Sequence, residues 1–248
     1  RRQRQMCIRD RLKLELENEE LSYRQSSNLQ GVIMETIDSN YAKELHYNQV
    51  NPYSQCLLHK DDKHTWKICT MTDEAYEKII LPMSKLSEFS LKKDSMKVQI
   101  TKRQLQTIDE KELLEEFYNK EEKRYFNLAF QTPTAFKQNG RYVFYPDLRL
   151  IYQSLMMKYS ATSDEMDMID EDTLEQLTQN SEIVRYRLQS QNFPLEGVNV
   201  QGFWGNIRIR IRGTDTMARY ARLLMRFGNY SGVGIKTAMG MGAIKLEK

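Results

Sequence analysis

The pattern of apolar and polar positions predicts the same order of elements twice along the chain. In the first half, leucines alternate with charged residues over 12–17, as in a half-buried strand, and apolar residues from Gln25 onward recur at spacings of three and four, as in a helix. The predicted elements are a strand at 12–17, a helical stretch from 25 to 46, a hairpin at 51–71, a helix at 72–86 and a strand at 95–105. This order, β-α-β-β-α-β, is that of a ferredoxin-like unit.

The second half repeats this order with different residues. Its predicted elements are a strand at 125–133, a short return at 141–146, a helix at 147–159, strands at 183–190 and 200–213, a helix at 214–227 that is stopped by Gly228, and a strand at 242–248. Glycine is common just beyond a helix because it adopts the left-handed conformation without strain. The sequence therefore predicts an α+β fold of two tandem ferredoxin-like (RRM-like, βαββαβ) domains.

Two segments outside this order set the expected domain boundaries. Residues 1–10, RRQRQMCIRD, match the translation of a transposon-type sequencing adaptor, so we expect an adaptor scar and exclude them from the fold. The rival interpretation is a basic arm that binds nucleic acid. Residues 108–123 are rich in charge and free of Gly and Pro, which predicts a helical linker. The expected domains are then 11–107 and 124–248.

Composition narrows the class of protein. The formal net charge is +3, and residues 1–10 carry four arginines and one aspartate, also +3, so the remaining chain is near neutral. A polyanion would therefore bind through a local patch. Beyond residue 10 only Cys56 and Cys69 occur, in no metal-ligand spacing, which favours a reducing compartment. No apolar run approaches the ~18 residues that cross a bilayer, so we expect a cytoplasmic protein without a membrane segment.

The acidic stretch SDEMDMIDEDTLEQ, residues 163–176, has two interpretations. Its carboxylates could bind a metal ion, or it could be a solvated loop that leads into a helix. No histidine or cysteine lies nearby, which favours the loop. Its charge would repel RNA, so we expect it to face away from any RNA path, and we expect neither a metal site nor a cofactor.

The stretch FGNYSGVGIKTAMGMG holds five of the eleven glycines, between Gly228 and Gly242. Glycines bring backbone N–H groups against a phosphate because no Cβ intervenes, although a glycine-rich turn without a ligand has the same composition. A P-loop is excluded because Ile235 separates Gly234 from Lys236 and no nucleotide-binding unit follows. A dinucleotide-binding loop is excluded because Thr237 stands where its third glycine would be.

This stretch closely resembles the C-terminal signature of the CRISPR-associated endoribonucleases that cut precursor CRISPR RNA, members of the repeat-associated mysterious protein (RAMP) superfamily. The segments FQTPTAFKQNGRYVFYPDLRLIYQSL and LQGVIMETIDSNYAKELH also resemble that family, and the resemblance spans 12–248. It implies a prokaryotic protein that binds CRISPR repeat RNA and delivers its product to an effector complex. It implies that RNA phosphate is held by Gly232, Gly234, Lys236, Thr237, Gly240 and Gly242.

The resemblance also implies cleavage without metal, in which the 2′-hydroxyl attacks the adjacent phosphate and leaves a 2′,3′-cyclic phosphate and a 5′-hydroxyl. This reaction needs a base, an acid and a positive charge, and histidine suits the proton transfers. His46 stands where the family commonly carries its catalytic histidine. His59 is the second candidate, Lys60 a candidate for stabilising charge, and His64 is expected in solvent.

The chain departs from the family at two positions. Some members carry a tyrosine where this sequence has Met34, and some carry a lysine where it has Asn51. The tyrosine–histidine–lysine triad therefore cannot be transferred whole, and the missing charge would come from Lys60 or from an arginine of the second domain.

Arginines supply the second binding signal. Arg208, Arg210 and Arg212 alternate with isoleucines, so they share one face of a strand, and Arg185 and Arg187 alternate likewise on the preceding strand. Five arginines on one sheet face predict a track for an RNA backbone, whereas the alternative is the ordinary solvated face of an antiparallel sheet. A weaker arginine stripe lies on the last helix, at Arg219, Arg222 and Arg226.

Together these features predict a metal-independent endoribonuclease that cleaves CRISPR repeat RNA. The alternative is a non-catalytic RAMP-type RNA-binding subunit of a CRISPR effector complex. The histidine at 46 favours the enzyme, and the missing tyrosine and lysine favour the alternative.

Overall fold

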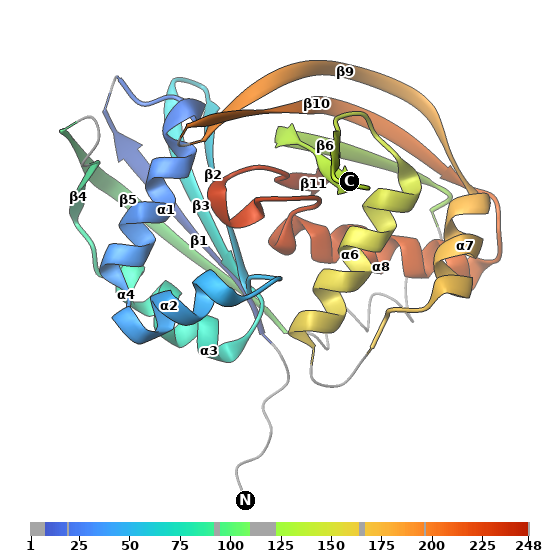
Figure 1. Ribbon diagram of the computed structural model, residues 1–248, viewed down its shortest axis with the longest axis horizontal. Coiled ribbons are helices and arrows are strands. Elements are labelled where there is room, and N and C mark those ends of the chain that lie inside the picture. Colours follow the sequence, from blue (N-terminus) through green and yellow to red (C-terminus); the bar gives the residue numbers. More distant parts are fainter. Residues whose placement is uncertain are drawn as a thin grey trace, which may run out of the picture.

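The computed structural model describes residues 8–18, 20–91, 95–109, 123–163, 167–195 and 197–247. Figure 1 shows two mixed α/β halves side by side. The N-terminal half consists of β1 (Ile8–Glu17), η1 (Tyr23–Gln25), α1 (Ser26–Thr36), α2 (Ser39–Tyr47), β2 (Tyr53–Lys60), β3 (Lys63–Thr70), α3 (Asp73–Ala75), η2 (Tyr76–Ile80), α4 (Leu81–Ser84), β4 (Glu88–Leu91) and β5 (Met96–Asp109).

The first sheet has the strand order β2-β3-β1-β5-β4. Its first four strands have the ferredoxin-like order, and the four-residue β4, which the sequence pattern did not reveal, extends the edge. The hairpin of β2 and β3 turns at Asp61 and Asp62, whose φ angles of 51° and 55° are those of a two-residue turn that matches the strand twist. Leu12, Leu14 and Trp66 face the helices and form the buried core of this half.

The C-terminal half repeats this plan. It consists of β6 (Tyr125–Thr134), β7 (Phe136–Gln138), β8 (Arg141–Val143), α6 (Leu148–Thr162), α7 (Glu171–Gln179), β9 (Ser181–Leu195), β10 (Val198–Ile211), α8 (Asp215–Ser231), η3 (Thr237–Met239) and β11 (Ile244–Leu246). The main sheet has the order β11-β6-β10-β9, which confirms the predicted tandem ferredoxin-like fold. The predicted short return is β8, which pairs with β7 in a separate two-stranded sheet.

The predicted end of the last helix at Gly228 is wrong. The helix α8 continues to Ser231, and Gly232, with φ 64°, caps it. Gly228 lies inside the helix, on the face of α8 that packs closely against β11 and α6. An added Cβ would overlap the side chain of Ile244 and come within 2.9 Å of Leu155.

The exclusion of all ten N-terminal residues from the fold is also wrong, because β1 begins at Ile8. Asp10 is 1% exposed, accepts a hydrogen bond from the Thr107 hydroxyl at 2.7 Å, and has a pKa raised by burial. Of the predicted linker, residues 108 and 109 belong to β5. The predicted helix over 110–122 lies outside the described residues.

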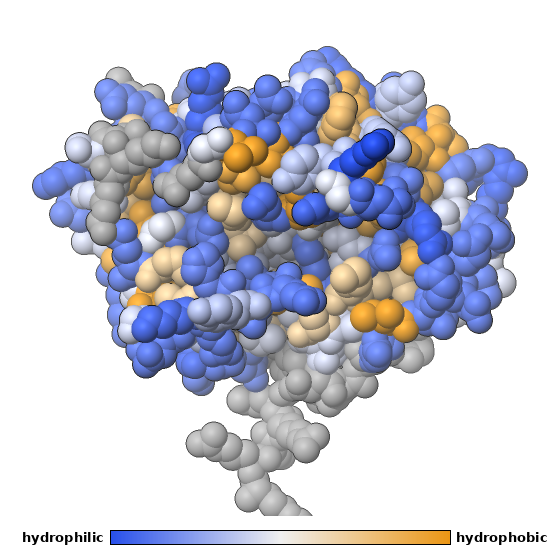
Figure 2. All heavy atoms as spheres, in the orientation of Figure 1, coloured by the Kyte–Doolittle hydropathy of each residue, from blue (hydrophilic) through white to orange (hydrophobic). Residues whose placement is uncertain are grey.

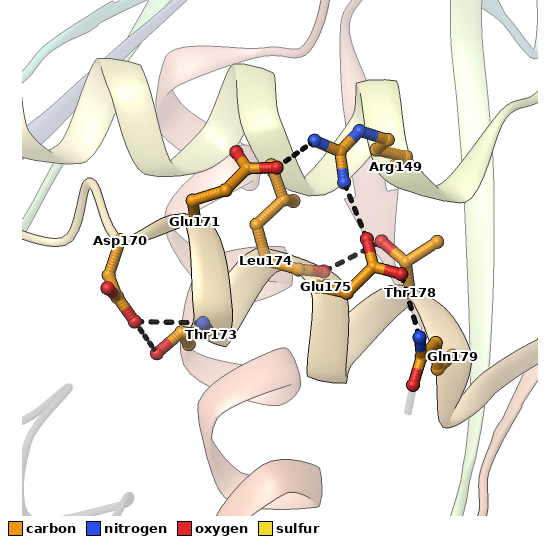
Figure 3. Close-up of polar contacts among 8 residues, drawn as sticks. All are labelled: Arg149, Asp170, Glu171, Thr173, Leu174, Glu175, Thr178 and Gln179. Carbon is orange, nitrogen blue, oxygen red and sulfur yellow. Dashed lines mark hydrogen bonds and ion pairs between the residues drawn. The ribbon is translucent and has the colours of Figure 1, made fainter.

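The described part of the acidic stretch, from residue 167, is a loop followed by α7. Asp170 caps this helix by accepting the Thr173 N–H at 2.8 Å. Figure 3 shows Arg149 of α6 between Glu171 and Glu175, and the Arg149–Glu175 ion pair measures 3.1 Å. These carboxylates therefore cap a helix and fasten it to α6.

Three sets of contacts join the two halves. The hairpin β9–β10 extends from the C-terminal half until its tip reaches α1, and the Ser27 hydroxyl of α1 donates to the Pro194 carbonyl at 3.3 Å. The end of α8 accepts hydrogen bonds from Arg11 and Ser54. Ala238 of η3 inserts into the N-terminal core. Among the helices described, none is long and apolar enough to cross a membrane.

Candidate functional site

A pocket of about 720 Å³ opens where α1, α2, the tip of the β9–β10 hairpin and the glycine-rich loop meet. Its polar lining includes Gln30, Lys43 and His46 from the N-terminal half and Lys236 from the loop. Figure 2 shows that the molecular face seen in Figure 1 is largely hydrophilic, with separate apolar patches. The pocket brings a histidine and a lysine from distant parts of the sequence to one place.

The helix α2 positions His46. Asp38 caps its start by accepting the N–H groups of Asn40 and Tyr41, at 3.0 and 3.1 Å. Tyr41 and Leu45 are buried against the core, so the neighbouring His46, in the last turn, is left exposed at the pocket. The packing of this short helix thus fixes the backbone from which the imidazole projects.

Two further residues of this pocket carry hydroxyl and amide groups that the sequence did not single out. Gln30 donates to the Tyr53 hydroxyl at 3.3 Å, and both side chains line the pocket. Tyr53 is almost completely buried, and this burial raises its pKa to about 12, so its phenol stays protonated at neutral pH. Tyr53 begins a strand and His46 ends a helix, so the sequence gave no reason to expect both side chains in one pocket.

The glycine-rich loop is tightly packed within the protein. The Gly234 N–H donates to Ser154 at 2.8 Å and the Gly242 N–H to the Pro133 carbonyl at 3.0 Å, so neither faces outward toward a phosphate. An added Cβ at Gly234 would overlap the Ala135 carbonyl, and one at Gly240 would meet Ser26 at 2.7 Å. The glycines at these positions therefore permit the loop to pack closely against the connection between β6 and β7 and against α1.

The exposed cation of this loop is Lys236. Its backbone is left-handed, with φ 54°, and its side chain lines the pocket. Thr237 beside it is buried and begins η3. Gly232 caps α8 from inside the loop, where an added Cβ would meet the Gly242 carbonyl at 2.9 Å. Of the loop residues predicted to meet RNA, Lys236 is thus the one with an exposed charged group.

His59 lies elsewhere, in a second cavity of about 570 Å³ that shares no lining residue with the first. It stands opposite His64 on β3, and the two ring centroids are 4.5 Å apart. Burial and the neighbouring His59 lower the pKa of His64, which is half-buried rather than free in solvent as predicted. Lys60 lies next to Asp61 at 4.0 Å. The structure therefore does not bring His59 and Lys60 to His46.

The five predicted arginines lie on the outer face of the second sheet and fall into two groups. Arg208 lies opposite Arg185 and stacks over the Tyr125 ring at 4.7 Å. Arg187 is exposed two residues further along β9. Arg210 and Arg212 instead form ion pairs with Glu182. The register places Glu182 directly opposite Arg210, so this carboxylate neutralises part of the predicted track.

The described residues include no group of three or more His, Cys, Asp or Glu side chains arranged to hold a metal ion. The arginines at 219, 222 and 226 of α8 are partly buried, so they form no open stripe.

Comparison with known proteins identifies the family. The model of the CRISPR-associated endoribonuclease Cas6 matches residues 128–244. The Cas6 of Streptococcus thermophilus is 38% identical over 88% of this chain and 89% of its own length. A Cas6 of Mycobacterium tuberculosis is 40% identical over 88% of this chain and 70% of its own length. This chain belongs to the Cas6 family of CRISPR-associated endoribonucleases.

The fold of the Cas6 family extends over the whole chain. A solved Cas6 product complex superposes with a TM-score of 0.82 at 21% identity, covering 97% of this chain and 100% of the other. The relatives at 38% and 40% identity confirm the family resemblance read from the glycine stretch.

The two departures from the Cas6 pattern have different settings. Met34 lines the pocket that contains His46, so its thioether occupies the region where a family tyrosine was expected. Asn51 is half-buried just before β2, and its Oδ1 accepts no hydrogen bond from the described part of the chain. The same pocket contains Tyr53, Lys43 and Lys236, which supply a phenol and two amines from other positions.

Proposed function

We propose that this Cas6-family protein cleaves CRISPR repeat RNA in the pocket between its two halves, by attack of a 2′-hydroxyl on the adjacent phosphate. The products are a 2′,3′-cyclic phosphate and a 5′-hydroxyl. The observation that carries the proposal is that His46 and Lys236 line one pocket. A histidine and a lysine at one place meet the main requirements of this reaction.

His46 is the group that transfers protons, because an imidazole can both accept and donate a proton. The Lys236 ammonium stabilises the charge that builds up on the phosphate oxygens in the transition state. Lys43 of α2 adds a second amine to the lining of the pocket. The protonated phenol of Tyr53 can only donate or accept a hydrogen bond, since its pKa of about 12 keeps the proton in place.

The RNA backbone would follow the outer face of the second sheet through the guanidinium groups of Arg185, Arg187 and Arg208, which form no ion pair with another described residue. Each contact would release a counterion and contribute affinity that falls with salt. Arg210 and Arg212 contribute less, because Glu182 already neutralises part of their charge. The acidic helix α7 leads into β9 at the far end from the hairpin tip, which keeps its carboxylates away from the pocket.

The second candidate function is a non-catalytic RNA-binding subunit of a CRISPR effector complex. The apolar Met34 in the pocket favours it, because a thioether cannot take the part of a tyrosine in proton transfer. In either case we place the protein in the prokaryotic cytoplasm, where an effector complex would receive its product.

One experiment separates these functions. The cognate repeat RNA is incubated with the protein in EDTA, next to the same RNA with hydrogen in place of the single 2′-hydroxyl beside the scissile phosphate. We expect the unmodified RNA to be cut and the deoxy RNA to be bound but left intact. A metal requirement or cleavage of the deoxy RNA would contradict the mechanism. Binding of both RNAs without cleavage would support the second candidate, a non-catalytic RNA-binding subunit.

A further inference from the structure

The glycine-rich loop is anchored on one face of α6. Ser154 accepts the Gly234 N–H at 2.8 Å, and Lys158 lies one helical turn further along the same face. Lys158 is 9% exposed and does not line the pocket, so its amine is not placed to contact RNA there. Two residues of one helix therefore hold two points of the loop.

The Lys158 amine has three hydrogen-bond acceptors. Its Nζ lies 3.3 Å from the Ser231 carbonyl oxygen, 3.4 Å from that of Gly232 and 3.1 Å from the Thr237 hydroxyl. The two carbonyls are at the end of α8, beyond the reach of the helix's own N–H ladder and at the negative end of the helix dipole. The Gly232 carbonyl also accepts the Ser231 hydroxyl at 2.8 Å. The three donors of an ammonium group match these three acceptors.

An amine is an unusual choice for this position. Burying a polar group costs free energy unless it is hydrogen-bonded, and a methionine or leucine would fill the same space without that cost. Burial lowers the pKa of Lys158 to about 7, and no carboxylate among the described residues offsets this effect. The amine is therefore explained by what it joins, the end of α8 and the start of η3.

The residue next to this junction is Lys236. Its left-handed backbone persists only where the surrounding structure holds it. We propose that Lys158 is a positioning residue for RNA cleavage, which ties α8 to η3 and so holds Lys236 in the pocket that contains His46. This inference rests on the proposed function of the pocket.

The first test is a change at position 158 that keeps the volume and removes the amine. Lys158→Met should slow single-turnover cleavage at saturating protein by ~10- to 100-fold, the range expected when a catalytic group is slightly misplaced, with RNA affinity changed less than about three-fold. The control is Lys102→Met, which removes an exposed amine on β5 that lines neither cavity and should leave the cleavage rate unchanged. Equal rates in both variants would overturn the proposal.

A double-mutant cycle distinguishes positioning from general destabilisation. Lys236→Gly removes the amine, and glycine adopts the left-handed backbone conformation without strain. If Lys158 acts through Lys236, then adding Lys158→Met to Lys236→Gly should cause little further loss of rate. Rate losses that multiply would mean that Lys158 acts on folding alone, and would overturn the proposal.

Amide hydrogen exchange tests the loop itself and needs no RNA. In Lys158→Met the amides of Gly234 and Met239 should exchange faster than in the wild type, while those of β5 should not. Unchanged exchange in the loop would overturn this inference whatever the activity. A wild type that cuts no repeat RNA, with a loosened loop in the variant, would instead count against the proposed function. Should Lys158→Met fail to fold, Thr237→Val removes one acceptor and is tested in the same way.

Discussion

His46 and Lys236 line the same pocket, although one ends a short helix of the first half and the other lies in the loop near the end of the chain. The loop reaches the pocket because η3 packs into the N-terminal core through Ala238. Neither half alone contains both groups, so the docking of the two halves creates the site.

The first prediction concerns the proton-transferring residue. His46→Ala should lower the single-turnover rate of repeat cleavage by ~10²- to 10⁴-fold, the usual contribution of general acid–base catalysis. RNA affinity, measured by filter binding, should stay within a few-fold because the backbone contacts remain. His59→Ala is the control, since His59 lies in the other cavity. Full activity of His46→Ala with loss in His59→Ala would reverse the assignment.

The second prediction concerns the glycine loop. Gly234→Val should lower the free energy of unfolding by ~1–3 kcal/mol, because the left-handed φ of 77° strains any residue with a Cβ and that Cβ would overlap Ala135. Gly31→Ala is the matched control. It lies in α1 with open space around it, so it should stabilise the protein by ~0.5–1 kcal/mol. Urea unfolding measures both. If Gly234→Val had normal stability but bound RNA weakly, that result would instead support a direct contact between this loop and a phosphate.

The third prediction separates the arginines by their ion pairs. Arg208→Ala should reduce the slope of log affinity against log salt by roughly 0.7, the loss of one contact to a single-stranded backbone. Arg210→Ala should change that slope less, because Glu182 already neutralises its guanidinium. Glu182→Gln should steepen the slope by freeing both partners. A salt titration in which Arg208→Ala and Arg210→Ala behave alike would show that the ion pair does not matter to RNA.

The fourth prediction concerns pH and the buried lysine. The pKa of Lys158 is about 7 in the folded protein against an ordinary 10.5, so between these values the unfolded chain binds more protons and stability rises with pH. Below pH 7 the Lys158 amine is protonated in both the folded and the unfolded protein, so this gain in stability is lost. Lys158→Met should therefore be more stable, relative to the wild type, at pH 6 than at pH 9. Urea unfolding at both pH values checks this, and a pH-independent difference would show that the amine titrates normally.

Local sequence signals determined most of the element order. Alternation at 12–17, the apolar spacing of three and four from Gln25 and the isoleucine–arginine alternation at 207–212 each act within a few residues, so they predicted strands and a helix that the structure contains. The glycine motif identified the family for the same reason. The short β4 and the continuation of α8 past Gly228 escaped prediction because packing against distant side chains, rather than local propensity, decides them.

The tertiary structure alone decided what the candidate residues contact. The loop glycines could be read as a cradle for phosphate, but long-range packing assigns the Gly234 N–H to Ser154 and the space at Gly234 to Ala135. Strand register sets Glu182 against Arg210, and domain docking joins Lys236 to His46 while leaving His59 apart. The physical reason is that a residue's type fixes which interactions it can make, whereas its partner depends on contacts between segments far apart in the chain.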